Sequence, residues 1–405
     1  MHTAEKHIQN ILNSKKISSK NRKELHELDI KLIADGRAMY TRKNRFDTLY
    51  KFTLFLNKDF DKVNKKDITS FCAYLEKTLN KGSPKGHKIN VKWFYRWYYK
   101  EYMNWNPRFK NDTPDIVSDI EIKNNNGLHK IPEELLTPED IKLLVNNTPS
   151  LRNKALIMVM YDGALRISEC LGLKLKHCIF DEYGGSITVD GKTGRRKLRL
   201  FDSIPYLKNY IETEHPNKNN PNETLFVGVA SKGVKKNDYG TPLRDGGVRI
   251  LFKRIADRAK LKKNFYPHIL RHSRLTELAK ILSEQELKVF AGWTASSNMA
   301  QVYIHLSGKD VEDKLLKHHG LIKEDSKKKE EPLKPKKCID PSCDYMNAAT
   351  NKFCSRCHRP IEIKEIMKIE DEQQLFNKVK EKAILEKLDI NAILEKIVEA
   401  KMKNR

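Results

Sequence analysis

Apolar residues recur at helical spacing along most of the chain, and one short stretch breaks this pattern. Residues 8–110 and 241–316 follow the three- and four-residue steps of amphipathic helices, as at Leu49, Phe52 and Leu56. A single interruption leaves room for only a small sheet. The sequence therefore predicts a mainly α-helical chain with a small β-sheet, an α+β fold class.

The interruption between residues 181 and 201 has the pattern of a β-hairpin. Two short runs of alternating apolar residues, 186–189 and 197–200, flank the segment 190–196. That segment is basic and contains glycines, which permit a tight turn. We therefore expect two strands joined by a basic turn.

Changes in composition divide the chain further. Residues 124–132 contain both Gly and Pro and few apolar side chains, which is typical of a linker. Thr137 and Pro138 then have the character of a helix start. The predicted segments are a helical domain (1–123), a linker (124–135), a second domain (136–320), a charged tether (321–337), a cysteine-rich segment (338–360) and an amphipathic helical tail (361–405).

The positive charge of the chain limits its partners. A formal net charge of +25 favours polyanions, which are nucleic acid or anionic membrane. The longest apolar run, 155–161, is far shorter than the roughly 20 residues that a membrane span needs. The first ten residues lack a secretory apolar region. We therefore expect a cytoplasmic protein that binds nucleic acid and no membrane.

Aromatic residues and cations alternate in the segment 91–100. One interpretation is a core helix whose aromatic face is buried while Lys92, Arg96 and Lys100 reach solvent. The cationic face of the same helix is also suited to direct DNA contact. The two interpretations are compatible.

Four of the seven cysteines lie close together, at Cys338, Cys343, Cys354 and Cys357. Closely spaced thiolates in a reducing compartment suit tetrahedral Zn²⁺. The four residues between the first pair exceed the usual two. We predict a structural zinc site that folds this segment and contacts either DNA or protein.

Five residues occur in an order that suits phosphodiester transfer, and they are Arg166, Lys192, His268, Arg271 and Tyr303. Two guanidiniums match the two non-bridging oxygens of a phosphate. A tyrosine nucleophile conserves bond energy in a covalent intermediate. A lysine can protonate the departing 5′ oxygen. His268 and Arg271 share one face if their segment is helical, and Pro267 marks a helix start whose free amides favour an anion.

These residues resemble the motifs of the tyrosine site-specific recombinases, the family that includes lambda integrase, Cre and the Xer proteins. Residues 163–173 look like its first-arginine motif and residues 268–273 like its His-x-x-Arg-His motif. Residues 299–310 look like the tyrosine segment of archaeal integrases. The resemblance covers residues 136–316. Zinc ribbons similar to residues 338–360 follow the catalytic domain in archaeal integrases.

The resemblance implies a role for each matched residue. Arg166 and Arg271 would clamp the phosphate, and Tyr303 would be the nucleophile. Lys192 would be the general acid, and His268 would be the proton-transfer partner. No metal or high-energy cofactor would be needed for strand exchange.

Three positions leave alternatives open. Lys192 fits the position of the family's lysine best. The alternatives are the neighbouring cations Arg195, Arg196 and Lys197. Where many members have a histidine this chain has Trp293, whose indole N–H can donate a hydrogen bond but cannot shuttle protons. Trp293 would therefore be a phosphate donor or a packing buttress, and Glu169 would brace Arg166 or the local helices.

The implied function is that of a site-specific DNA recombinase or integrase, and whether it serves a mobile element or the host chromosome stays open. Residues 1–123 would be a core-binding domain that grips DNA, and residues 136–320 would be the catalytic domain. A homotetramer on double-stranded recombination sites, at the nucleoid, would cleave and rejoin strands through a covalent 3′-phosphotyrosine. The alternatives are a chromosome-dimer resolvase of the Xer type, a topoisomerase, and a non-cleaving DNA-binding protein on the same scaffold.

Overall fold

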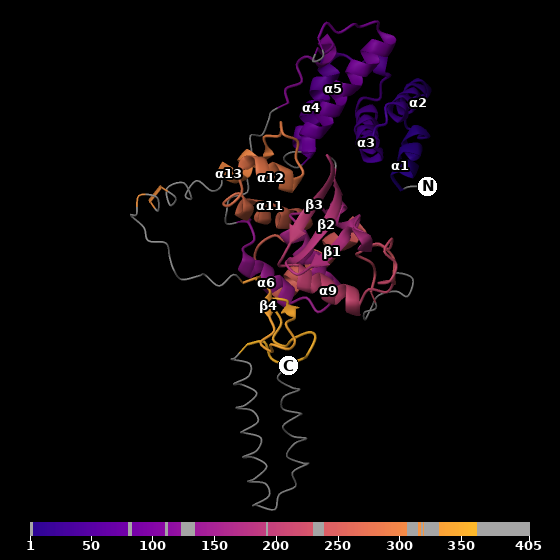
Figure 1. Cartoon of the computed structure of the whole chain (residues 1–405). Coiled ribbons are helices and arrows are strands. Elements are labelled where there is room, and N and C mark those ends of the chain that lie inside the picture. The colour runs from indigo at the N-terminus through magenta and orange to yellow at the C-terminus, as the bar shows by residue number, and fades with distance from the viewer. Residues whose placement is uncertain are drawn as a thin grey trace, which may run out of the picture. The chain divides into compact units, whose positions relative to one another are not determined.

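The structure is a computed structural model of the chain, and it forms two compact units, Met1–Leu128 and His129–Arg405, each with its own core (Figure 1). It describes residues 3–79, 83–109, 112–122, 134–191, 193–229, 239–305, 315–316, 319 and 332–362. Most of the predicted linker and nearly all of the predicted helical tail lie outside the described residues.

The first unit is helical throughout its described residues. Its α-helices are α1 (Thr3–Leu12), α2 (Ser19–Ala34), α3 (Met39–Leu56), α4 (Lys65–Thr78) and α5 (Ser83–Tyr102), with the short 3₁₀ turns η1 (Phe60–Lys62) and η2 (Asp115–Val117). Local sequence sets the helix starts. Ser18 accepts a hydrogen bond from the backbone of Asn21 at α2, and Asn64 and Asp67 form a reciprocal capping box at α4.

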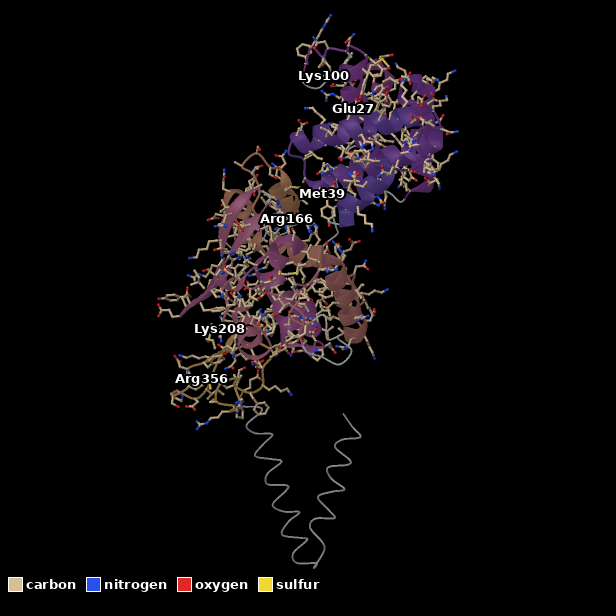
Figure 2. The ribbon with its side chains drawn as sticks, turned by 90° about the vertical axis from the view of Figure 1, so that its right-hand side faces the viewer. Glu27, Met39, Lys100, Arg166, Lys208 and Arg356 are labelled. Carbon is tan, nitrogen blue, oxygen red and sulfur yellow. The ribbon has the colours of Figure 1, made fainter. Side chains whose placement is uncertain are left out.

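The aromatic segment of α5 lies in the core of this unit. Phe94, Tyr95 and Tyr98 are buried, and the Phe94 ring lies 4.6 Å from the ring of Phe60. Lys100, from the same helix, is exposed (Figure 2). The core-helix interpretation of this segment is therefore confirmed, because the large aromatic rings remove the most apolar surface from water. DNA contact by the cationic face stays a prediction.

The second unit combines helices with two small sheets. Its helices are α6 (Pro138–Asn146), α7 (Leu151–Asp162), α8 (Ile167–Leu171), η4 (Leu175–His177), α9 (Ile204–Thr213), α10 (Asp245–Ala259), α11 (Pro267–Leu278), α12 (Glu284–Ala291) and α13 (Met299–His305). Its strands are β1 (Cys178–Asp181), β2 (Gly184–Gly191), β3 (Gly194–Leu200), β4 (Lys336–Lys337) and β5 (Met346–Asn347). The predicted fold class, mainly helical with little sheet, is confirmed.

The predicted hairpin is present, but its turn is tighter and its sheet is larger than the sequence suggests. Strands β1, β2 and β3 form one antiparallel sheet, so a third strand precedes the predicted pair. The β2–β3 ladder continues to the Gly191–Gly194 pair, which places most of the predicted turn within the strands. Gly194 has a φ of +116°, a conformation that L side chains rarely adopt. The glycine therefore allows the strands to pair up to the turn, where Lys192 lies outside the described residues.

Helix α7 runs through the core of the second unit. Every residue from Ala155 to Asp162 is buried, so the longest apolar run of the sequence is a core helix. None of the described helices is long and apolar enough to cross a bilayer. Asp162, at the end of α7, accepts hydrogen bonds from the backbone N–H groups of Phe201 and Ser203 and pairs with Arg274 at 3.3 Å. One carboxylate thereby joins α7, the end of β3 and α11.

We expect Asp162→Asn to destabilise the second unit by about 3 kcal/mol, because the amide turns one buried acceptor into a donor that faces other donors. Differential scanning calorimetry of the full-length protein would measure a lower transition temperature for that unit. The exposed Asp257→Asn is the matched control. Equal transition temperatures in the two variants would contradict this role of Asp162.

The cysteine-rich segment packs onto the second unit. Leu333 and Ala348 belong to the main core of that unit, and Thr350 forms two hydrogen bonds with the Tyr206 hydroxyl of α9. Arg356 of this segment lies at the same end of the unit as Lys208 of α9 (Figure 2), and both side chains line one groove. The folded part of this segment thus starts before Cys338. The sequence assigned residues 332–337 to the charged tether, but in the structure they belong to the folded segment, because Leu333 is buried.

Candidate active site

Arg166 lies at a sharp reversal between α7 and α8. Helix α7 ends at Gly163, Ala164 takes a φ of +45°, and Arg166 forms the N-cap of α8. Positive φ is uncommon for a residue with a side chain, so surrounding contacts must hold Ala164 in place. The reversal leaves the Arg166 side chain 29% exposed (Figure 2). Arg166 therefore combines a fixed backbone with access to solvent.

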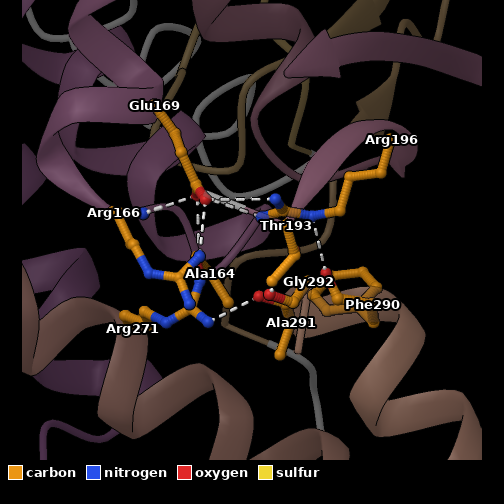
Figure 3. Close-up of polar contacts among 9 residues, drawn as sticks. All are labelled: Ala164, Arg166, Glu169, Thr193, Arg196, Arg271, Phe290, Ala291 and Gly292. Carbon is orange, nitrogen blue, oxygen red and sulfur yellow. Dashed lines mark hydrogen bonds and ion pairs between the residues drawn. The ribbon is translucent and has the colours of Figure 1, made fainter. Parts of the chain in front are cut away.

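Arg271 of α11 supplies the contact that holds the reversal. Its Nη1 donates to the carbonyl of Ala164 and its Nη2 to the carbonyl of Ala291, both at 2.6 Å (Figure 3). Burial and the nearby positive charge of Arg166 lower the pKa of Arg271 to about 10, so the guanidinium stays charged at neutral pH. Arg271 thus joins the α7–α8 loop to the end of α12.

Glu169 of α8 faces three arginines. It accepts from Arg166 Nη1 at 2.6 Å and from Arg196 Nη2 at 3.0 Å, and it lies 3.9 Å from Arg271 (Figure 3). Burial opposes ionisation, but the hydrogen bonds from Arg196 and from the Arg166 backbone outweigh it and lower the pKa of Glu169. Three cations and one anion leave an excess of two positive charges. The cluster therefore attracts an anion.

Arg196 attaches the β2–β3 hairpin to α12. Its Nε donates to the Phe290 carbonyl at 3.1 Å, and Thr193 Oγ1 donates to the Gly292 carbonyl at 3.0 Å (Figure 3). Gly292 has a φ of +64°, and a Cβ there would lie 2.6 Å from Arg196 Nη1. Sequence reasoning treated Arg196 only as an alternative to Lys192. Its structural role depends on partners about 100 residues away, which local sequence does not reveal.

Tyr303 of α13 is buried between two rings. Its ring lies 5.6 Å from Trp293 and 5.7 Å from His272, in stacked arrangements, and it is only 2% exposed. Its hydroxyl lies 2.7 Å from Nδ1 of His272. Burial raises the pKa of Tyr303 to about 12, although the charges of Arg271 and Arg166 act in the opposite direction. The phenol is thus protonated at neutral pH and close to the arginines.

His268 lies one helical turn before His272, and the two rings meet edge to face at 4.6 Å. Partial desolvation, followed by the charges of Arg271 and Arg166, lowers the pKa of His268 although the residue remains exposed. At neutral pH its imidazole is therefore neutral.

The structure gathers most of the predicted residues in one place. Contacts among the described residues connect Arg166, Arg271, Trp293 and Tyr303, and His268 joins them through His272. Lys192 itself lies outside the described residues, and its neighbours Gly191 and Thr193 lie beside the cluster. Sequence reasoning missed His272. The sequence feature that could have revealed it is its position four residues after His268, which places both on the same helix face.

The four predicted metal ligands also come together. The Sγ atoms of Cys338, Cys343, Cys354 and Cys357 all lie within 4.8 Å of one another, an arrangement that can bind a metal ion.

Residues 134–309 match the model of the phage integrase family. The tyrosine recombinase XerC of Listeria monocytogenes serovar 1/2a is 29% identical over 184 residues, which are 43% of this chain and 56% of the relative. The chain therefore spans little more than half the length of this relative. XerC of Lactobacillus leichmannii is 27% identical over 261 residues, 61% of this chain and 80% of the relative.

Two solved structures share the fold of this chain. XerH bound to a palindromic difH substrate, in a post-cleavage complex, has a TM-score of 0.55 at 19% identity. The match covers 78% of this chain and 94% of the XerH chain. A lambda integrase dimer bound to a COC′ core site has a TM-score of 0.54 at 16% identity. The match covers 75% of this chain and 81% of the lambda integrase chain.

We expect Glu169→Gln to destabilise the second unit by about 3 kcal/mol at pH 7, because it leaves three close guanidiniums without a counter-charge. The lowered pKa means that the charge of Glu169 stabilises the fold above pH 4.5, its ordinary pKa, and that this contribution is lost as the pH falls through the lowered value. Wild type and variant should therefore converge in acid. Urea unfolding at pH 7 and in acid measures the free energy of unfolding of wild type and variant. The exposed Glu182→Gln is the control. A difference in unfolding free energy that persists unchanged in acid would contradict this role of the Glu169 charge.

Proposed function

We propose that this protein is a site-specific DNA recombinase that cleaves and rejoins strands through a covalent 3′-phosphotyrosine at Tyr303. The observation that carries this proposal is the position of the Tyr303 hydroxyl beside an arginine cluster with excess positive charge. The similarity to XerC, and to XerH and lambda integrase folds bound to DNA sites, supports it.

Arg166 and Arg271 would hold the scissile phosphate. Arg166 is partly exposed and can donate to a non-bridging oxygen, while the buried Arg271 contributes its charge from a fixed position. Fixed guanidiniums stabilise the charge that develops on the phosphorane without reorganising. Trp293 stacks on Tyr303 and lies 5.6 Å from the Arg271 guanidinium, which favours a role as a packing buttress.

The cleavage step would form one bond and break one. The Tyr303 oxygen loses its proton and attacks phosphorus, and the bond from phosphorus to the 5′ oxygen breaks. Lys192 would protonate that oxygen, with His268 as a proton-transfer partner. The products are a 3′-phosphotyrosine and a free 5′ hydroxyl, and the reverse reaction joins strands without an external energy source.

The substrate would be double-stranded DNA at recombination sites, bound by a homotetramer at the nucleoid in the cytoplasm. The net charge of +25 suits such a polyanion. A chromosome-dimer resolvase of the Xer type would use the same chemistry. A non-cleaving DNA-binding protein is disfavoured, because Arg166, Arg271 and Tyr303 are all present at the cluster.

We expect Tyr303→Phe to abolish covalent trapping while DNA binding persists, because only the attacking oxygen is lost. A randomised pool of nicked duplexes incubated with full-length wild type would yield adducts that survive detergent, and sequencing them gives the captured duplex. Gel assays then measure trapping and binding for each variant. Tyr183→Phe, exposed in the β1–β2 turn, is the control. Trapping by Tyr303→Phe would place the nucleophile elsewhere.

The four cysteines would hold one structural zinc ion in a zinc ribbon. Tetrahedral coordination at about 2.3 Å separates the sulfurs by about 3.8 Å. The Cys338–Cys357 and Cys343–Cys354 sulfur pairs lie 3.6 Å and 3.7 Å apart. Cys354 also accepts from the Asn347 amide and the Arg356 backbone, contacts that suit a thiolate. The bound ion would cross-link residues 338–343 to residues 354–357, in a segment too small to fold by burial alone.

Metal analysis of the purified protein should find one zinc per chain, and Cys354→Ser should lose most of it because three thiolates bind zinc more weakly. Since the ribbon packs against Tyr206, zinc loss should also lower the transition temperature of the second unit. Cys72→Ser, in the first unit, should keep both the zinc and the transition temperature. Full zinc content in Cys354→Ser would rule out this ligand set.

A further inference from the structure

We propose that His272 accepts the proton of the Tyr303 hydroxyl as the tyrosine attacks DNA. This role belongs to neither of the two basic residues that the resemblance assigns to proton transfer. The inference rests on the proposed function, and it adds a catalytic residue to that site.

The contact geometry assigns the direction of the hydrogen bond. The Tyr303 hydroxyl lies 2.7 Å from Nδ1 of His272. Among the described residues, the guanidiniums of Arg271 and Arg166 act on the phenol and the Trp293 indole stacks on it, and all three groups can only donate. We therefore assign the Tyr303 hydroxyl as the donor and Nδ1 of His272, in the tautomer that leaves it unprotonated, as the acceptor.

Tyr303 needs such an acceptor. With a pKa of about 12, about one molecule in 10⁵ would be a phenolate at pH 7. An imidazole, with an ordinary pKa of about 6.5, is matched to accept a proton at neutral pH. The arginines then stabilise the negative charge that develops on the oxygen. Burial keeps the hydroxyl from unproductive ionisation, and His272 removes the proton only as the bond to phosphorus forms.

His268 is less suited to this step. Its ring meets the ring of His272, whereas the Tyr303 hydroxyl contacts His272. The resemblance assigned proton transfer to His268 because it opens the His-x-x-Arg-His motif. In this structure the last residue of that motif lies next to the nucleophile, because four residues bring His272 round to the same face of α11.

The proton balance of the step is complete. The O–H bond of Tyr303 breaks and its proton passes to His272 Nδ1, while the phenolic oxygen bonds to phosphorus. The bond to the 5′ oxygen breaks, and that oxygen takes a proton from the general acid. In the reverse reaction His272 returns its proton to Tyr303. Among the described residues, His268 meets the ring of His272, and the charges of Arg271 and Arg166 act on Tyr303. Glu169 pairs with these two arginines and with Arg196 of β3.

The test compares wild type with His272→Asn and His268→Asn in single-turnover cleavage of the captured duplex between pH 5.5 and 9. The Asn side chain can keep the hydrogen bond from Tyr303 but cannot take its proton. We expect wild-type rates to rise with pH and level off near neutrality. His272→Asn should be slower by about 10²–10⁴-fold at pH 7, and its rate should keep rising to pH 9 as Tyr303 itself ionises. His268→Asn should be slower than wild type, because His268 assists protonation of the 5′ oxygen, but its rate should still level off near neutrality because His272 is intact.

A second variant separates proton transfer from folding. His272→Ala leaves a space beside Tyr303, and added imidazole should restore cleavage with a pH dependence that follows the titration of free imidazole. A structural role would give no such rescue. Calorimetry and DNA binding on the same preparations show whether each variant is folded.

The outcomes distinguish this inference from the proposed function. If wild type forms no adduct with any duplex in the pool, the recombinase function itself fails. If wild type forms an adduct that Tyr303→Phe loses, but His272→Asn cleaves at the wild-type rate with the wild-type pH profile, only the role of His272 is overturned. If the cleavage rate of His268→Asn alone fails to level off near neutrality, His268 and not His272 accepts the Tyr303 proton.

Discussion

One buried carboxylate, that of Glu169, holds together the cationic cluster of Arg166, Arg196 and Arg271. Three guanidiniums brought this close would repel one another, and Glu169 offsets that repulsion while orienting two of them through hydrogen bonds. The carboxylate side chain is 2% exposed, so solvent screens these interactions little. Because the offset is incomplete, the cluster keeps excess positive charge where a phosphate would bind.

The arginines of this cluster also connect elements that are far apart in sequence. Arg271 bonds to carbonyls of the α7–α8 loop and of α12, and Arg196 bonds the β2–β3 hairpin to α12. The segment after α12 carries Trp293, against which Tyr303 packs. The position of Tyr303 therefore depends on the same charges that would bind the proposed substrate. A change at any of these contacts would disturb both.

Sequence alone predicts the broad fold and most of the site, because both depend on local signals. Helical spacing, the glycine-rich turn and the aromatic face of α5 are read within a few residues of each position. Contacts between residues that are far apart in the sequence cannot be read in this way. The positive φ of Ala164, the attachment of Arg196 to Phe290, and the burial of Leu333 depend on contacts between distant segments. His272 is visible in the sequence, but its partner Tyr303 lies 31 residues away.

The most direct measurement of the central claim is the chemical identity of the adduct. After nuclease and protease digestion of the trapped complex, mass spectrometry of the peptides locates the residue that carries a nucleotide. We expect a nucleotide 3′-phosphate on the peptide that contains Tyr303, and fragmentation should place it on the phenolic oxygen. An adduct on any other residue, or a nucleotide attached through its 5′ phosphate, would contradict it.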